Sequence, residues 1–155
     1  MSKSTEKFSL KNPIHFLALG FGSGLMPKAP GTFGTLAAIP LYFLMMPLSS
    51  LYYAAIVLLI CISGIYICGK AASDAGVHDH GAIVWDEIAG FLITMFMVPV
   101  SWQSIVVGFL LFRIFDIFKP WPISYIDKNV HGGFGIMFDD VLAGIFALAC
   151  MHLIF

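Results

Sequence analysis

Two long stretches without a charged side chain limit what this sequence can fold into. They run from residue 29 to 69 and from 88 to 112, and neither contains Asp, Glu, Lys or Arg. An α-helix needs about 20 apolar residues to cross the roughly 30 Å hydrocarbon core of a bilayer. The first stretch is long enough for two helices, and the segment MPLSS (46–50) would form the turn between them. The pattern therefore predicts a helical membrane protein.

The composition agrees with a membrane protein and excludes other classes. The chain has 155 residues, of which 59% are hydrophobic and 11% charged, and its mean hydropathy is +0.93. An ordinary soluble domain has about 25% charged residues. The formal net charge of −1 also lacks the basic excess of nucleic-acid-binding proteins. We therefore expect one membrane-embedded domain over residues 1–155 that binds no nucleic acid.

The expected fold is an all-α polytopic membrane bundle of about four to five helices. Residues 1–12 are polar and are expected to be flexible, and Pro13 suits the first turn of a short helix at the membrane interface. The clearest span is 51–68. The second uncharged stretch is broken at 99–104, and a last apolar helix is expected over 141–155.

Glycine and proline divide the chain further. The segment 20–35 contains five glycines and two prolines, so we expect an ordered loop there and no regular helix. HGGFG (131–135) is expected to be another loop in which the backbone can approach a ligand.

The charged residues indicate which segments share a side of the membrane. If each hairpin crosses and returns, residues 1–33, 70–87 and 113–140 face the same compartment. These three segments contain every Lys, Arg, Asp and Glu in the sequence. Basic residues concentrate on the cytoplasmic side of membrane proteins, so the charged side is predicted to face the cytoplasm.

Two acidic pairs are the strongest candidates for a metal site. Asp86 with Glu87, and Asp139 with Asp140, each stand just before an apolar helix. Helix capping is the simpler explanation for either pair alone. Four carboxylates brought together would repel one another unless a cation lies among them, and oxygen-rich clusters suit Mg²⁺. The predicted metal ligands are therefore Asp86, Glu87, Asp139 and Asp140.

Several residues in the same charged segments could bind a phosphate. Arg113 and Asp116 lie three residues apart near a membrane, where ionisable groups are usually functional, although a simple ion pair is the alternative. The glycine-rich turn around Thr32 could cradle phosphate oxygens, or it could be a plain loop before a helix. The predicted phosphate-binding residues are Thr32, Thr35, Arg113, Lys119 and His131, and the predicted catalytic residues are Asp86, Glu87, Asp116, Asp139 and Asp140. Asp116 and Asp127 could serve either as metal ligands or as orienting partners for the basic side chains.

Other chemistries find less support. His78 and His80 lack cysteine partners at zinc-binding spacing, and Gly22-Ser23-Gly24 lacks the spacing of a nucleophile elbow. The sequence also lacks the motifs of the phosphatases that form a covalent intermediate. Attack by water, assisted by a metal, is the reaction that remains.

Three long strings identify a family that the sequence resembles. They are GFGSGLMPKAPGTFGTLAAIP (20–40), GVHDHGAIVWDEIAG (76–90) and FRIFDIFKPWPISYIDKNVHGGFGIMFDDVLAG (112–144). With them, residues 13–155 resemble phosphatidylglycerophosphatase A, a family of bacterial membrane lipid phosphatases. Carried onto this sequence, the acidic positions of the family's motifs are Asp86, Glu87, Asp116, Asp127, Asp139 and Asp140.

The resemblance implies an activity and a location. The expected reaction is Mg²⁺-dependent hydrolysis of phosphatidylglycerophosphate to phosphatidylglycerol and phosphate, in glycerophospholipid biosynthesis. The expected location is the bacterial cytoplasmic (inner) membrane, with the phospholipid substrate and the bilayer as partners. Two alternatives belong to other classes. A CDP-alcohol phosphotransferase would carry the pattern D-G-x2-A-R-x8-G-x3-D-x3-D, which this sequence lacks, and a transporter or channel would place charges within its spans.

Overall fold

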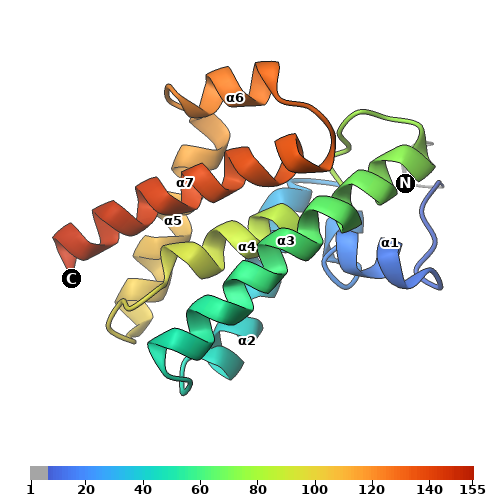
Figure 1. The fold of residues 1–155 in the computed structure, drawn as a ribbon. Coiled ribbons are helices and arrows are strands. Elements are labelled where there is room, and N and C mark those ends of the chain that lie inside the picture. The colour runs from blue at the N-terminus through green and yellow to red at the C-terminus, as the bar shows by residue number, and fades with distance from the viewer. Residues whose placement is uncertain (1–6) are drawn as a thin grey trace.

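The computed structural model describes residues 7–155, and this part of the chain is helical without any strand (Figure 1). The all-α prediction is therefore confirmed for these residues. The elements are α1 (Pro13–Ala18), the 3₁₀ turn η2 (Ser23–Leu25), α2 (Pro30–Met45), α3 (Ser50–Ala75), α4 (Trp85–Thr94), α5 (Trp102–Phe118), α6 (Ile123–Asn129) and α7 (Gly132–Ile154).

The short helix α4 lies at the centre of the bundle. Eight of its ten residues are buried, because α2, α3, α5 and α7 all pack against it. After its first turn, α4 consists almost entirely of apolar residues, and a helix that is hydrophobic all round requires such an enclosed position. The Tyr53 hydroxyl of α3 donates a hydrogen bond to the Leu92 carbonyl oxygen (2.7 Å), near the C-terminal end of α4. This contact ties the C-terminal half of α4 to α3.

Two glycines let α4 and α7 cross in close contact. A Cβ atom at Gly144 would lie 2.6 Å from the carbonyl oxygen of Gly90, so only glycine fits there. The Thr94 hydroxyl lies 2.9 Å from the Gly90 oxygen and 3.4 Å from the Gly144 oxygen. Both helices run in the same direction (Figure 1). Residues one turn before the crossing, Asp86 on α4 and Asp140 on α7, are therefore brought to the same side.

A second close crossing joins α3 and α7 and explains a wrong prediction. HGGFG was expected to be a loop, but α7 begins at Gly132. A Cβ atom at Gly133 would lie 1.8 Å from the Ile65 carbonyl oxygen, and one at Gly69 would lie 3.2 Å from the Gly133 Cα. The glycine at position 133 therefore serves helix packing inside α7.

The prediction of a loop over 20–35 is also wrong for its second half. The segment contains the turn η2, but α2 already begins at Pro30 and includes GTFGT. Proline fits the first turn of a helix because that turn needs no backbone N–H donor. A Cβ atom at Gly34 would lie 2.5 Å from the Cβ of Val84. This glycine lets α2 approach the residue that precedes α4.

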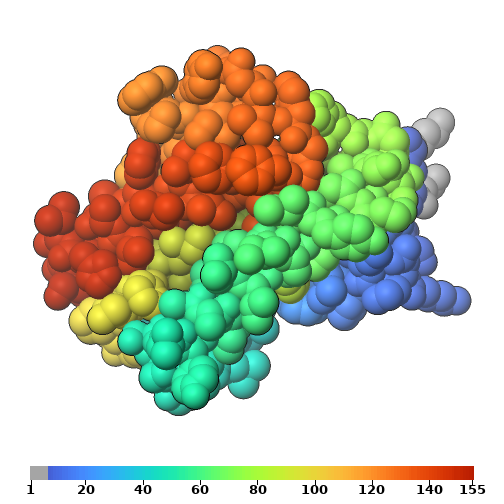
Figure 2. All heavy atoms as spheres, viewed as in Figure 1, coloured from blue at the N-terminus to red at the C-terminus, as the bar shows by residue number. Residues whose placement is uncertain are grey.

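Within residues 7–155, two helices are long and apolar enough to span a membrane, α3 with 26 residues and α7 with 23. These two candidate spans are fewer than the four to five predicted. Helices rise about 1.5 Å per residue, so the 10 residues of α4 cover only about 15 Å and the 16 of α2 about 24 Å. The predicted turn at 46–50 is confirmed, and the segment 51–68, predicted to be a span, lies within the candidate span α3. Both long helices run along the face shown in Figure 2. The helix α3 exposes apolar side chains such as Leu59 (66% exposed).

The charged segments gather at one end of the bundle. The loop between α3 and α4, the helix α6 and the start of α7 lie together there, whereas the turns after α2 and α4 and the C-terminus lie at the other end (Figure 1). Of the segment 1–12, which was predicted to be flexible, residues 1–6 lie outside the described part of the chain. The rest of it contacts the charged end, because the Lys7 ammonium donates to the Ala75 carbonyl oxygen (2.8 Å). Pro13 does begin a short helix, as predicted.

Candidate active site

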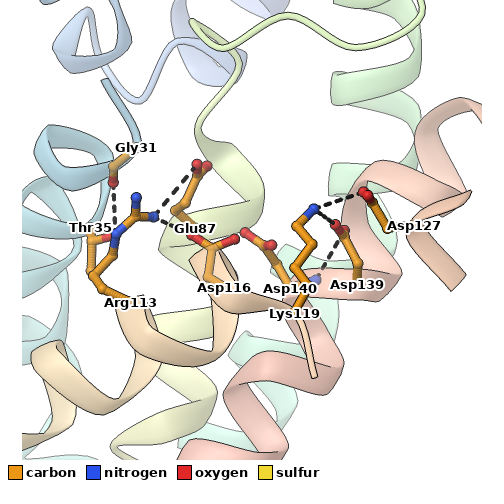
Figure 3. A network of polar contacts seen from close by, with 9 residues as sticks. All are labelled: Gly31, Thr35, Glu87, Arg113, Asp116, Lys119, Asp127, Asp139 and Asp140. Carbon is orange, nitrogen blue, oxygen red and sulfur yellow. Dashed lines mark hydrogen bonds and ion pairs between the residues drawn. The ribbon is translucent and has the colours of Figure 1, made fainter. Parts of the chain in front are cut away.

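Three carboxylates from two helices meet near the crossing of α4 and α7. Asp86 and Glu87 lie in the first turn of α4, and Asp140 lies in α7. One carboxylate oxygen from each residue lies within 4.8 Å of the other two. Glu87 and Asp140 extend into the same space between their helices, beside Asp116 (Figure 3). We call Asp86, Glu87 and Asp140 the carboxylate group.

Each member of the carboxylate group has a buried oxygen atom without a partner. Among residues 7–155, Asp86 Oδ1, Glu87 Oε2 and Asp140 Oδ2 have no hydrogen bond. Burial raises the pKa of Asp86 well above its ordinary value. Burial also raises the pKa of Glu87 to about 7, although the nearby Arg113 lowers it. Unpartnered buried oxygens are costly, and an oxygen-only set of this kind fits a hard divalent cation such as Mg²⁺.

Neither acidic pair makes a capping hydrogen bond at the start of its helix. The N-cap position of α4 is Val84, and no side chain there makes a capping hydrogen bond. Asp139 and Asp140 lie inside α7, which begins at Gly132, so they are too far along the helix to cap it. The expectation that this second pair precedes its helix is wrong, because α7 starts earlier than expected.

Of the four predicted metal ligands, Asp139 lies outside the carboxylate group. Its Oδ2 atom accepts a hydrogen bond from the Lys119 ammonium (2.7 Å), which also donates to Asp127 Oδ1 (2.7 Å). Its Oδ1 atom accepts from the Asp140 backbone N–H (3.0 Å). Burial alone would lower the pKa of Lys119, but these two carboxylates raise it above its ordinary value. Lys119 is thus a fixed positive charge next to the group (Figure 3).

Arg113 provides a second positive charge on the other side of the carboxylate group. Its Nη1 atom donates to Asp116 and lies 4.0 Å from Glu87 Oε1. The Arg113 side chain is only 15% exposed, and its Nε atom has no partner among the described residues. The ion pair with Asp116 predicted as the simpler alternative is therefore present, and it leaves a donor of Arg113 unused.

A polar cleft of about 310 Å³ opens beside Asp139. Its polar lining consists of His78, Asp79, Asp127, His131 and Asp139. The rings of His78 and His131 lie with their centres 4.5 Å apart. The predicted phosphate-binding residue His131 thus lines the same cleft as Asp139. His78 and Asp79 were not among the predicted site residues. The sequence placed them in a polar segment, but their contact with α7 depends on the tertiary fold.

The two predicted threonines lie in α2, whereas the basic side chains Arg113 and Lys119 lie on either side of the carboxylate group. Thr35 is fully buried and its hydroxyl donates to the Gly31 carbonyl oxygen within α2 (2.8 Å). Thr32 lies partly buried in the first turn of the same helix. The structure therefore gives the Thr35 hydroxyl a partner inside its own helix, next to Arg113 (Figure 3).

Comparison with known proteins gives matches over nearly the whole chain. A profile of the family described as phosphatidylglycerophosphatase A matches residues 16–155. Phosphatidylglycerophosphatase A of Escherichia coli strain K12 is 51% identical over 151 residues, which are 96% of this chain and 87% of that protein. The protein of that name from Haemophilus influenzae is 51% identical over 145 residues, 92% and 89% of the two chains.

A more distant relative carries a different name. A putative phosphatidylinositol-3-phosphatase of Bacteroides thetaiotaomicron is 41% identical over 140 residues, 84% of this chain and 86% of that protein. No solved structure matches the chain. The family match includes all the site residues described above.

Proposed function

The chain belongs to the phosphatidylglycerophosphatase A family, and we propose that it hydrolyses phosphatidylglycerophosphate to phosphatidylglycerol and inorganic phosphate. The names of the two relatives at 51% identity support this substrate. The structural observation that carries the proposal is the carboxylate group, with its ligand atoms within 4.8 Å and a cationic side chain on each side. A phosphomonoester brings nearly two negative charges, so an acidic site can accept it only with additional positive charge.

We assign this additional charge to a divalent cation, Mg²⁺. Asp86, Glu87 and Asp140 would hold it, and their unpartnered buried oxygens support that assignment. When bound, such an ion offsets the carboxylate charges and polarises a phosphoryl oxygen.

Arg113 and Lys119 are the residues that would hold the substrate phosphate. Arg113 Nε has no partner among residues 7–155. An ammonium group can donate three hydrogen bonds, and Lys119 donates two to carboxylates. Both side chains can therefore bind a phosphoryl oxygen without giving up their present contacts. Donors already in place stabilise the charge of a phosphoryl-transfer transition state, and Asp116 and Asp127 keep these two cations in position.

Asp139 is the carboxylate that we assign to proton transfer. As the attacking water bonds to phosphorus it must lose a proton, and the ester oxygen must gain one as its bond to phosphorus breaks. Asp139 is next to the carboxylate group without belonging to it, and it faces the polar cleft. His131 lines the same cleft and would contact the phosphate there.

The proposed location is the bacterial cytoplasmic membrane, with the charged end facing the cytoplasm and the reaction serving phospholipid biosynthesis. The two long apolar helices and the named relatives support membrane association. The location of every Lys and Arg in three segments supports the orientation.

Phosphate release from phosphatidylglycerophosphate by the purified protein tests the proposal. We expect release with Mg²⁺, none with excess EDTA, and recovery when Mg²⁺ is added back. Phosphatidylinositol 3-phosphate should be assayed in parallel because of the name of the Bacteroides relative, and we expect slower release from it. Absence of release from phosphatidylglycerophosphate in the presence of Mg²⁺ would refute the proposed function.

A further inference from the structure

The glycine-rich start of α2 lies directly against the candidate active site. Gly31, the second residue of this helix, is buried. A Cβ atom at this position would lie 2.6 Å from Glu87 Oε1, and 3.0 and 3.1 Å from Arg113 Nη1 and Nη2. Carbon atoms pack at about 3.5–4.0 Å from their neighbours. The missing side chain of Gly31 therefore leaves the space in which these two side chains lie.

The atoms that meet Gly31 belong to charged groups, which distinguishes it from the other tightly packed glycines of the described residues. At Gly133 and Gly144 an added Cβ would meet backbone carbonyl oxygens of a neighbouring helix, and at Gly34 it would meet the Cβ of Val84. At Gly31 the three nearest atoms are all side-chain ends of Glu87 and Arg113. A methyl group there would be accommodated by moving these ends, because long side chains rotate more easily than helices move.

Glu87 and Arg113 come from different helices, so their relative position depends on the walls around them. Glu87 lies in α4 and Arg113 in α5, with 4.0 Å between Oε1 and Nη1. The first turn of α2, at Gly31, packs against both of these side chains. Glycine is an unfavourable residue in a helix compared with alanine, so its presence here has no local benefit for α2.

We propose that Gly31 is a positioning residue of the active site, which acts by leaving room for the Glu87 carboxylate and the Arg113 guanidinium to lie side by side. Gly31 itself contacts neither substrate nor cation. This inference rests on the proposed function, because it takes Glu87 as a cation ligand and Arg113 as a phosphate ligand. It also gives the GTFGT segment a role different from the phosphate cradle predicted from its glycines.

Gly31→Ala tests the inference, with Gly81→Ala as the matched control. A Cβ atom at Gly81 would lie 3.8 Å from Pro30 Cγ, an ordinary contact. We expect Gly31→Ala to fold and to melt near the wild-type temperature. Its kcat/KM for phosphatidylglycerophosphate should fall by about 10²-fold, the loss typical of a displacement near 1 Å at an active site. Mn²⁺ binding, measured by electron paramagnetic resonance, should weaken as well, whereas Gly81→Ala should match the wild type in both measurements.

Glu87→Asp provides a second measurement that a merely structural role would not affect. The aspartate is one methylene shorter, so it should make room for the added methyl group. We expect the double variant Gly31→Ala/Glu87→Asp to lose less Mn²⁺ affinity than the fold-losses of the two single variants multiplied together. The inference would be overturned if the two fold-losses in Mn²⁺ affinity simply multiply in the double variant. It would also be overturned if Gly31→Ala matches Gly81→Ala in kcat/KM and in Mn²⁺ affinity. Unfolding of Gly31→Ala that Glu87→Asp does not reverse would also overturn it.

These readouts separate the inference from the proposed function. If the wild type releases no phosphate, the proposed function fails, but the Mn²⁺ affinities of the variants still test the position of Glu87. If the wild type is active and the Gly31→Ala protein is equally active and binds Mn²⁺ equally well, only the inference fails.

Discussion

The ammonium group of Lys119, the residue that directly follows α5, lies 2.7 Å from the carboxylate of Asp139 in α7. This contact directs Asp139 away from the carboxylate group to which its neighbour Asp140 belongs. Successive residues of a helix point about 100° apart, so two adjacent aspartates can serve two different purposes. In the proposed reaction, Asp140 holds the cation and Asp139 transfers a proton.

Replacement of Lys119 should therefore impair turnover more than folding. In Lys119→Gln, one donor to the phosphate is lost and Asp139 loses its partner. We expect kcat/KM for phosphatidylglycerophosphate to fall by about 10²–10³-fold, the loss seen when one transition-state donor is removed. Lys128→Gln is the control, because Lys128 is also basic and lies exposed in α6. Equal activity of the two variants would contradict the role of Lys119.

Neutral replacements of the carboxylate group should abolish activity while the protein stays folded. Asp86→Asn and Asp140→Asn keep the side-chain shape but remove a buried charge whose oxygen has no partner. We expect turnover to fall by orders of magnitude, and the melting temperature in EDTA to stay equal or rise. Asp74→Asn is the control, since Asp74 is paired with His15 (3.1 Å) and Lys70. Near-normal turnover of both test variants would refute the cation site.

Thermal stability without a cation should depend on pH in a defined direction. The pKa of Glu87 is raised from 4.5 to about 7 in the folded protein, and that of Asp86 is raised too. Between pH 4.5 and about 7, Glu87 is more protonated in the folded protein than in the unfolded protein. The free energy of unfolding therefore falls as pH rises through this range. Melting in EDTA should therefore occur at a lower temperature at pH 8 than at pH 5.5.

Mg²⁺ should reverse this trend, because cation binding requires ionised carboxylates and is opposed by protons at low pH. The stabilisation by Mg²⁺ should thus be larger at pH 8 than at pH 5.5. A pH-independent melting temperature in EDTA would show that Glu87 and Asp86 do not titrate in this window.

The three tryptophans allow a test of membrane embedding. Trp102 and Trp121 lie near the two ends of α5 and are 71% and 79% exposed, whereas Trp85 is 7% exposed. Tryptophan is enriched at both membrane interfaces. In single-tryptophan variants, with the other two changed to Phe, brominated lipids should quench Trp102 and Trp121 strongly and Trp85 weakly. Quenching of Trp102 and Trp121 by aqueous iodide alone would contradict the embedding.

The sequence was sufficient to predict what depends on residue type and hydrophobic length. The all-α class and the turn at 46–50 both appear in the structure. Arg113 and Asp116 pair because residues three apart share a helix face. These features are local, so they can be inferred without knowledge of the fold.

The errors arose where glycines serve packing between helices. Gly31 and Gly133 were interpreted as loop residues, but both lie inside helices that approach another part of the chain closely. The same misinterpretation placed Asp139 and Asp140 before a helix. The separation of Asp139 from the carboxylate group depends on Lys119, twenty residues away, and no local pattern contains that contact.

The concentration of charge at one end of the bundle has a consequence for biogenesis. The turns after α2 and α4 and the C-terminal residues contain no Lys, Arg, Asp or Glu. When the chain is inserted from the charged side, no Lys, Arg, Asp or Glu side chain has to cross the hydrocarbon core. Each such side chain costs about 2.5–3.5 kcal/mol at the centre of a membrane helix. The nascent chain could thus acquire its orientation before the carboxylate group is assembled.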